Sequence, residues 1–235
     1  MFKYLTSILA LWVGLLVSTA TCWAQAKQYL PTGLQLSTDI YQPLYYYGYQ
    51  KTGPQYEFNA TIDFARLMLE GDYGWGRIRR KGIHKETYIT SIVKNEGHYF
   101  RIGLNYNFIK NSIDHNAAFL GLRYAKSYFR DHLKSILYDR YWGGHLVDSQ
   151  QANLQARWFE IVAGVRVKVW EWIYMGCTAR YKFGKKISHA TSHLPFDIIG
   201  WGLNEEDALG LSYYIILRIP LQKDKHTPKK NKRRY

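Results

Sequence analysis

Histidine and serine are the residues of this chain with the most direct potential for catalysis. Nucleophilic hydrolysis needs a serine within hydrogen-bond reach of a histidine, which must itself be oriented by a third group. The chain has 8 histidines, and none is followed by serine two residues later, the spacing that places both on one face of a strand. In the adjacent pairs Ser188-His189 and Ser192-His193 the side chains diverge. The sequence therefore predicts no catalytic residues and a protein that is not an enzyme.

Residues that could bind a metal are equally sparse. His189 and His193 are four positions apart, which suits a helix, but their surroundings show no apolar helical stripe. The acids at 205–207 lack the glycine-containing spacing of a calcium loop. Cys22 falls in the N-terminal segment described below, which leaves Cys177 as the one remaining thiol. We expect no metal site, no cofactor and no intrachain disulfide.

Most charged residues of the central region lie in segments where polar and apolar residues alternate. In the fourth such segment, for example, Phe100 and Ile102 alternate with Arg101 and Gly103. A period of two places the two kinds of side chain on opposite faces of a β-strand. Acids and bases of the polar faces nearly balance, and we expect them to pair inside a small barrel. This predicted lumen charge network comprises Glu57, Asp63, Glu70, Asp72, Arg101, Arg123, Glu160, Arg166, Lys168, Arg180, Lys182 and Arg218.

Eight segments show the alternation and are predicted to be strands: 34–40, 56–64, 67–75, 100–108, 118–124, 159–169, 173–183 and 209–221. A strand of about 9–11 tilted residues crosses a bilayer, and no later segment has the run of about 18 apolar residues that a membrane-spanning helix needs. We therefore predict an all-β fold, an eight-stranded antiparallel transmembrane β-barrel of the outer-membrane type. A soluble sandwich or lipocalin-like barrel is the alternative, and it would place its apolar face inward.

The connections between these strands are expected to alternate in length. Long loops are predicted at 42–55, 79–97, 129–156 and 184–207, and the other connections are short. Transmembrane barrels have short periplasmic turns and long loops outside. An even number of strands then places both termini in the periplasm.

The two ends of the chain differ from the barrel that we predict for residues 27–221. Residues 1–26 combine Lys3, an apolar core and then small residues, which is the pattern of a cleaved secretory signal peptide. Cleavage after Ala24 or after Ala26 fits this pattern. Residues 222–235 are rich in lysine and arginine and are expected to form a disordered periplasmic tail.

The composition suits an exported membrane protein. Aromatic residues make up 17% of the chain, with 21 tyrosines, and the formal net charge is +14. Aromatic rings with polar tips are favoured at the membrane–water interface. A strongly basic chain can also bind nucleic acid, but an exported chain does not meet it, so no nucleic-acid partner is expected.

A basic cluster follows the third predicted strand. Continuing its alternation places Arg77 and Arg79 outward, just above Tyr73 and Trp75, at the height of the outer-leaflet headgroups. Arginine suits phosphate because its planar fork donates two hydrogen bonds at once. The cluster is either a solvated rim or a site for lipopolysaccharide or an acidic protein partner, and it comprises Arg77, Arg79, Arg80, Lys81 and Lys85.

Four of the strand segments resemble a known family. They are HYFRIGLNYNF (98–108), FLGLRYAKS (119–127), WFEIVAGVRVKVWEWIYMG (158–176) and GLSYYIILRIPLQK (210–223). They are similar to an outer-membrane β-barrel family of unknown function found in Bacteroidota, well over 98–223 and loosely over 30–97. The resemblance implies an outer-membrane location and a role in the envelope, and it supplies no catalytic motif.

Three functions remain open at this stage. The sequence favours a non-enzymatic barrel that is a structural or accessory subunit of an envelope complex, such as one for barrel assembly or secretion. A lipid A-modifying barrel enzyme is the alternative, but the catalytic spacing is absent. A small channel or ligand-binding barrel is a further alternative, against which the balanced lumen charges argue.

Overall fold

The computed structural model describes residues 30–49, 53–64, 66–84, 89–109, 112, 114–139, 143–191 and 193–222. The predicted signal peptide at 1–26, nearly all of the basic tail and Lys85 lie outside the described residues.

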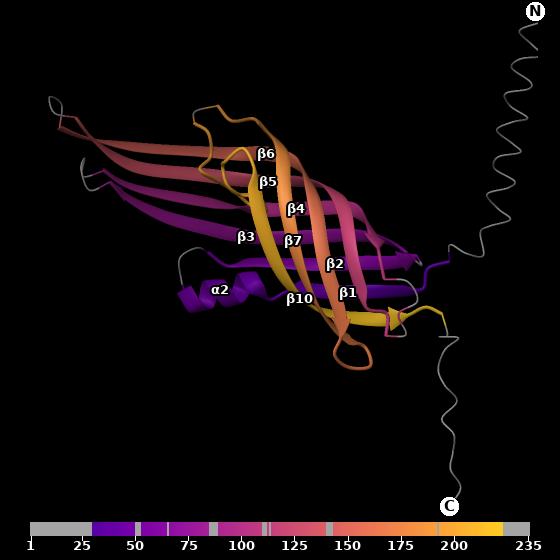
Figure 1. Cartoon of the computed structure of the whole chain (residues 1–235). Coiled ribbons are helices and arrows are strands. Elements are labelled where there is room, and N and C mark those ends of the chain that lie inside the picture. Colours follow the sequence, from indigo (N-terminus) through magenta and orange to yellow (C-terminus); the bar gives the residue numbers. More distant parts are fainter. Residues whose placement is uncertain are drawn as a thin grey trace, which may run out of the picture.

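The main element is a closed antiparallel β-barrel (Figure 1). Going round it, the strands follow the order β1-β10-β7-β6-β5-β4-β3-β2, and β1 pairs with both β10 and β2. The predicted eight-stranded barrel is therefore confirmed. Its strands are β1 Gly33–Asp39, β2 Gln55–Phe64, β3 Leu67–His84, β4 Ile89–Asn107, β5 Ala117–Asp139, β6 Gly143–Lys168, β7 Ile173–Ser188 and β10 Ala208–Pro220.

The barrel is apolar outside and charged inside. On β4 the outward side chains Ile102 and Leu104 are 53% and 56% exposed, whereas Arg101, between Phe100 and Ile102, is 3% exposed. The same alternation gives fully buried Arg123 and Glu160 on β5 and β6. Exposing so much apolar wall to water while burying charge is unfavourable. A wall of this kind is matched to lipid, as the sequence alternation predicts.

In the part of the chain that the structure describes, no helix has both the length and the apolar character needed to cross a membrane.

Aromatic side chains mark two levels on the outer wall. One level is near the turns, where Phe108 directly follows β4 and Trp172 directly precedes β7. The Tyr106 ring packs edge-on against the Phe108 ring, with centroids 5.3 Å apart. From Phe100 on β4 to Phe108 the two levels are eight residues apart, or roughly 20 Å for strands tilted by about 40°. That spacing approaches the ~25 Å apolar band of a transmembrane barrel. The other level, here called the aromatic girdle, runs across β2 to β7 through ring contacts Tyr56–Trp75 (5.8 Å), Tyr73–His98 (6.1 Å), His98–Tyr128 (5.5 Å), Tyr124–Phe159 (5.6 Å) and Phe159–Phe183 (6.2 Å).

The two ends of the barrel have different connections. The first and last described segments meet at one end, where the Leu221 amide donates to the Thr32 carbonyl at 3.1 Å. The β2–β3, β4–β5 and β6–β7 connections lie at this same end, which we call the turn end. The opposite end, which we call the hairpin end, carries the long β3–β4 and β5–β6 hairpins (Figure 1).

The prediction of long loops at 79–97 and 129–156 is wrong, because the described residues of both segments are strand. β3 pairs with β4 out to His84↔Ile89, and β5 pairs with β6 out to Asp139↔Gly143. Beyond the apolar band the outer face of these strands is exposed, and the inner face holds buried polar as well as apolar side chains, such as Asp131 and Ile78. The apolar alternation therefore stops while the backbone ladder continues. The result is the projecting sheet, made of residues 77–84, 89–96, 130–139 and 143–153.

The other two predicted long loops also contain structure. The segment 42–55 is mostly helix α2 (Tyr41–Tyr49), whose first amide is accepted by the Asp39 carboxylate at 2.8 Å. The segment 184–207 begins as the end of β7 and then folds into the barrel mouth. Within it β8 (Asp197–Ile198) pairs with β9 (Gly202–Leu203), and the positive φ of 84° at Gly200 permits the turn between them. We call residues 189–207 the inward loop.

Candidate functional site

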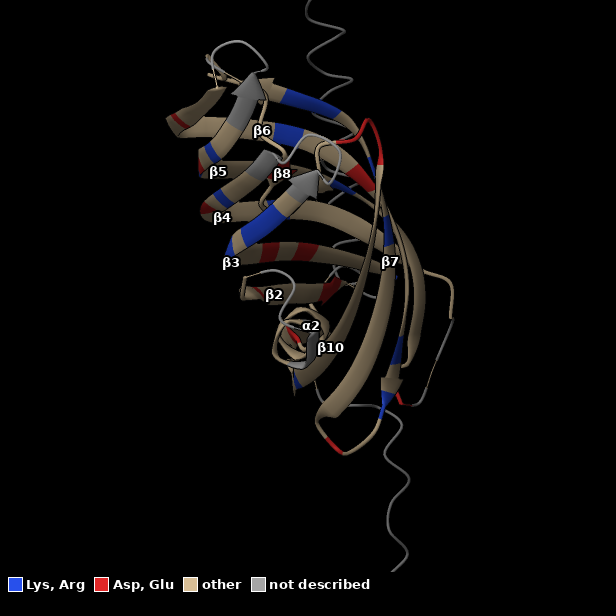
Figure 2. Cartoon of the chain, turned by 90° about the vertical axis from the view of Figure 1, so that its left-hand side faces the viewer, with Lys and Arg blue, Asp and Glu red and all other residues tan. Residues whose placement is uncertain are grey.

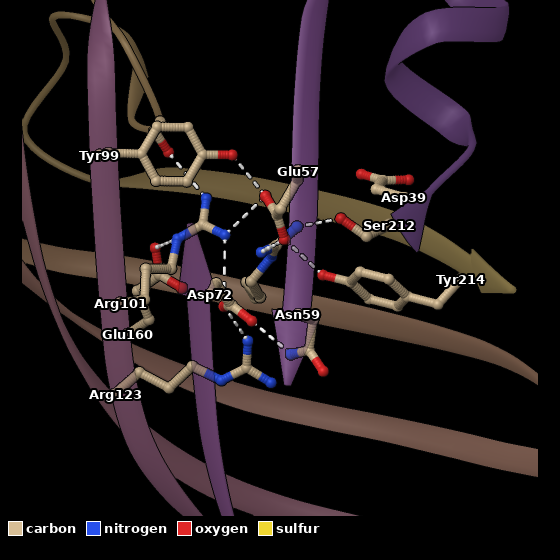
Figure 3. A network of polar contacts seen from close by, with 12 residues as sticks. Asp39, Glu57, Asn59, Asp72, Tyr99, Arg101, Arg123, Glu160, Ser212 and Tyr214 are labelled. Carbon is tan, nitrogen blue, oxygen red and sulfur yellow. Dashed lines mark hydrogen bonds and ion pairs between the residues drawn. The ribbon is translucent and has the colours of Figure 1, made fainter. Parts of the chain in front are cut away.

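The centre of the lumen is organised around one carboxylate, Glu57 on β2 (Figure 3). Its Oε2 accepts from Arg101 Nη1 at 2.7 Å and from the Tyr99 hydroxyl. Its Oε1 accepts from the Tyr214 hydroxyl at 2.6 Å and from Arg180 Nη1 at 3.1 Å. Four strands, β2, β4, β7 and β10, are thus joined across the barrel through a single buried side chain.

A second set of contacts lies beside Glu57. The Arg123 guanidinium donates to Asp72 at 2.7 Å and to Glu70 at 2.5 Å, and the Asn59 and Asn105 amides donate to Glu70 as well. The register explains how Arg123 reaches a strand two away, because Gly103 lies directly between Glu70 and Arg123. A Cβ on Gly103 would come within 2.5 Å of Arg123 Cγ, so only glycine leaves that path open.

Arg101 connects the two sets. Its guanidinium lies 2.7 Å from Glu57, 3.5 Å from Asp72 and 3.1 Å from Glu160. Glu160 also accepts from the Trp158 indole at 2.7 Å. Together these residues form the central charge layer: Glu57, Glu70, Asp72, Arg101, Arg123, Glu160 and Arg180.

A smaller charged layer lies toward the turn end. The Asp63 carboxylate accepts a hydrogen bond from the Gln35 side-chain amide at 2.5 Å. The same carboxylate oxygen is 3.5 Å from the Arg166 guanidinium and 3.6 Å from the Arg218 guanidinium. Between this layer and the central one is a cavity of about 30 Å³, room for about one water molecule. Lys168 is different, because its ammonium pairs with Asp114 at 3.2 Å at the partly exposed mouth of the turn end.

At the hairpin end the inward loop covers the central charge layer. The Lys182 ammonium donates to the carbonyls of Gly200 and Trp201, each at 2.8 Å, and Trp201 packs edge-on against Trp158 at 5.6 Å. Ile198 and Ile199 of the inward loop are fully buried. A loop sequence as apolar as Ile198-Ile199-Gly200-Trp201 was the signal that this segment folds inward, and the sequence prediction missed it.

Arg80 was predicted to lie on the outer rim, and this is wrong. It sits at an inward position of β3 and donates to the buried Asp197 carboxylate at 2.7 Å. Burial raises the pKa of Asp197, and the Arg80 guanidinium opposes that rise. The alternation itself assigns Arg80 to the inner face, because it is one residue from Arg79. Burial has the opposite effect on a lysine: it lowers the pKa of Lys185 on β7, and the Glu205 and Glu206 carboxylates oppose that fall.

The remaining described rim residues are outside. Arg77, Arg79 and Lys81 are exposed on the outer face of β3, and Arg77 pairs with Glu96 on β4 at 3.0 Å. They do not meet the lumen network.

A space remains above the central charge layer. A cavity of about 450 Å³ is lined by parts of α2, β2, β10 and the inward loop, and also by Glu57, Arg101 and Arg180. The central charge layer is therefore the floor of this cavity. Among the described residues no group of three or more metal-ligating side chains comes together.

One contact set resembles catalytic chemistry. His193 of the inward loop lies 2.8 Å from Asp131 through Nε2, while its Nδ1 is 3.2 Å from the Ser149 hydroxyl and 3.0 Å from the Gln151 amide. No sequence pattern indicates this set, because its members come from β5, β6 and the inward loop. With Nε2–H donating to Asp131, Nδ1 is an acceptor, and the Gln151 amide competes with Ser149 for its one lone pair. The Gln151 amide also donates to the His193 carbonyl at 2.7 Å, so the set anchors the loop.

A protein-family model described as a domain of unknown function, DUF6048, matches residues 1–224. The chain belongs to this family. No curated protein matches the chain. The solved structures that resemble this DUF6048 member include CarO of Acinetobacter baumannii, with 9% identity, a TM-score of 0.42 and coverage of 82% of this chain and 99% of CarO.

Two further structures resemble it. The attachment invasion locus protein Ail of Yersinia pestis has 9% identity and a TM-score of 0.37, covering 81% of this chain and 100% of Ail. Neisserial surface protein A has 12% identity and a TM-score of 0.31, covering 80% of this chain and 96% of that protein.

Replacing Arg101 tests the central charge layer. The substitution Arg101→Met should lower the free energy of unfolding by about 3–5 kcal/mol, because it leaves Glu57 and Glu160 buried without one of their cations. Arg77→Met is the matched control, since its pair with Glu96 is exposed and should contribute little. The free energy of unfolding of both variants is measured by urea unfolding of the refolded barrel, with loss of the fast-migrating unboiled band in SDS gels as the readout. Equal effects of the two substitutions would contradict the role assigned to the layer.

Proposed function

We propose that this protein is a non-enzymatic integral barrel of the outer membrane that serves as a structural or accessory subunit of an envelope complex. The sealed lumen carries the proposal. The turn-end layer, the central charge layer and the inward loop close the interior in succession, so the barrel is unsuited to passing a solute. The resemblance of four strand segments to a Bacteroidota outer-membrane family supports a role in the envelope of such a cell. Barrel assembly or secretion is the kind of envelope complex that we propose.

The orientation follows from the unequal ends. Short connections of transmembrane barrels lie on the periplasmic side. On that basis the turn end and both termini, including the basic tail, face the periplasm, and the projecting sheet stands outside the cell.

The projecting sheet offers an accessory subunit a place to bind. In the described part of the chain, β2 pairs with β3 only as far as Gly76, and β7 pairs with β6 only as far as Gln155. Beyond those points β3 and β6 are edges, and edge strands are templates for pairing with another chain.

Site-specific photo-crosslinking tests the subunit role. A crosslinker at Leu146, 69% exposed on the β6 edge, should give adducts with a discrete protein in native membranes. Leu104 is the matched control, because it is 56% exposed on the lipid-facing wall and should give lipid adducts alone. Absence of any protein adduct at Leu146 and at other edge positions would remove the support for an accessory role.

Conductance separates this function from that of a channel. The refolded protein should show no steady current in planar bilayers. A variant in which residues 195–203 are replaced by a glycine-serine linker should also be silent, because the central charge layer remains beneath the loop. Steady single-channel currents from the unaltered protein would contradict the proposal.

The Ser149–His193–Asp131 contacts favour lipid hydrolysis as a second candidate. Under our proposal, lipid A from cells that express the protein and from cells that express Ser149→Ala should have the same acyl composition by mass spectrometry. The reason is that Gln151 shares the histidine nitrogen that would activate the serine. Loss of an acyl chain with the unaltered protein alone would instead establish an enzyme.

A further inference from the structure

The outer wall carries a group of bases at the hairpin end that extends well beyond the sequence-predicted rim. The pairing register places them on the outward faces of β3 to β7, and Figure 2 shows basic stretches on β3, β4, β5 and β6. Some of these bases have a carboxylate partner: Arg77 pairs with Glu96, and Lys134 pairs with Asp148 at 3.0 Å. In the described part of the chain the others have no carboxylate within 4.0 Å, and we call them the basic belt: Arg79, Lys81, Lys94, Lys126, Arg130, Arg157 and Lys186.

Several members of the belt face like charges directly. Lys126 is opposite Arg157, and Arg157 is opposite Lys186, so three bases stand in a row across β5, β6 and β7. Arg79 is opposite Lys94 in the same way. Directly opposed residues have Cβ atoms about 5 Å apart, where like charges are destabilising unless an anion lies between them. A multivalent anion bound between these bases would offset their repulsion.

The height of the row identifies where that anion would be. Arg157 is the next outward residue above Phe159 of the aromatic girdle, and Lys126 lies between the girdle residues Tyr124 and Tyr128 on the outer face of β5. The Lys126 ammonium also lies 4.7 Å from the centre of the Tyr128 ring. Girdle aromatics sit at the headgroup level of a membrane. Bases within the upper part of the girdle and just above it are at the level of lipid phosphates.

The belt occupies one side of the wall. The acids Glu205, Glu206 and Asp207 are exposed on the connection between β9 and β10, on the opposite side of β7 from β6. The excess of exposed positive charge is therefore on the β3–β7 side, which attracts an anion there.

From these observations we propose that the basic belt binds the phosphates of a phosphorylated glycolipid of the outer leaflet, of the lipid A class. Lys126, Arg157 and Lys186 hold one phosphate, with the planar Arg157 fork donating two hydrogen bonds to it. Arg79 and Lys94 hold a second. This inference rests on the outer-membrane location proposed above, and it replaces the predicted rim of Arg77, Arg79, Arg80, Lys81 and Lys85.

Binding of lipid A by the purified, refolded chain in neutral detergent tests the proposal. The probes are lipid A with its phosphates and the same lipid A after the phosphates have been removed, with affinities from native mass spectrometry. The unaltered protein should prefer the phosphorylated form, and Lys126→Gln/Arg157→Gln should bind it roughly tenfold more weakly. The matched control Lys134→Gln/Lys168→Gln removes two bases that already have carboxylate partners, and it should bind like the unaltered protein.

The outcomes separate this inference from the proposed function. A folded barrel, judged by heat-modifiable migration, that binds the two lipids equally overturns the belt and leaves the membrane location standing. Equal weakening in both double variants also overturns it, because general charge would then explain the binding. A chain that does not insert into bilayers at all would instead refute the proposed function.

Discussion

Charges held inside a lipid-facing wall must neutralise one another, and the rest of the structure depends on this constraint. An ion buried without a partner costs several kcal/mol, so each lumen carboxylate needs a cation from another strand. Glu57 obtains Arg101 from β4 and Arg180 from β7, and these contacts cross the barrel. The cross-barrel pairs fix which strands lie opposite one another. They also fill the interior, so a closed lumen follows from the same requirement that selects the register.

The same constraint explains which parts of the fold could be read from the sequence. Within the membrane, one face of each strand is apolar and the other is polar, as with Ile102 and Arg101, and the period of two is plain. In the projecting sheet Arg79, Arg80 and Lys81 are all basic although they alternate between faces. The inner face there buries polar as well as apolar side chains, such as Asp131 and Ile78, so polarity does not distinguish the two faces. The strands were therefore predicted to end where the membrane ends, and the continuing backbone ladder was not predicted.

Charge could be assigned to the lumen from the sequence, and Tyr214 shares the polar face of its predicted strand with Arg218. Tyr99 could not be assigned in this way. Both tyrosines donate to Glu57 from inward positions, yet a tyrosine in a barrel strand is equally typical of the girdle. Which role a tyrosine has depends on its parity within the strand, and the predicted fourth strand began one residue too late to include Tyr99. The inward loop needed tertiary information of another kind. Its contacts, such as Lys182 with the Trp201 carbonyl, join residues whose proximity only the closed barrel creates.

A molecule that neutralises its interior has its uncompensated groups on the outside. In the described residues the lumen bases of the central charge layer each lie within ion-pair distance of a carboxylate, whereas Arg157 and its neighbours in the row do not. Placing like charges opposite one another on adjacent strands lowers stability and does nothing for a barrel that is already closed. In the complex that we propose, lipid phosphates offset this repulsion at the height of the aromatic girdle. The interior charges thus serve folding, and the interactions that we propose involve the wall and the projecting sheet.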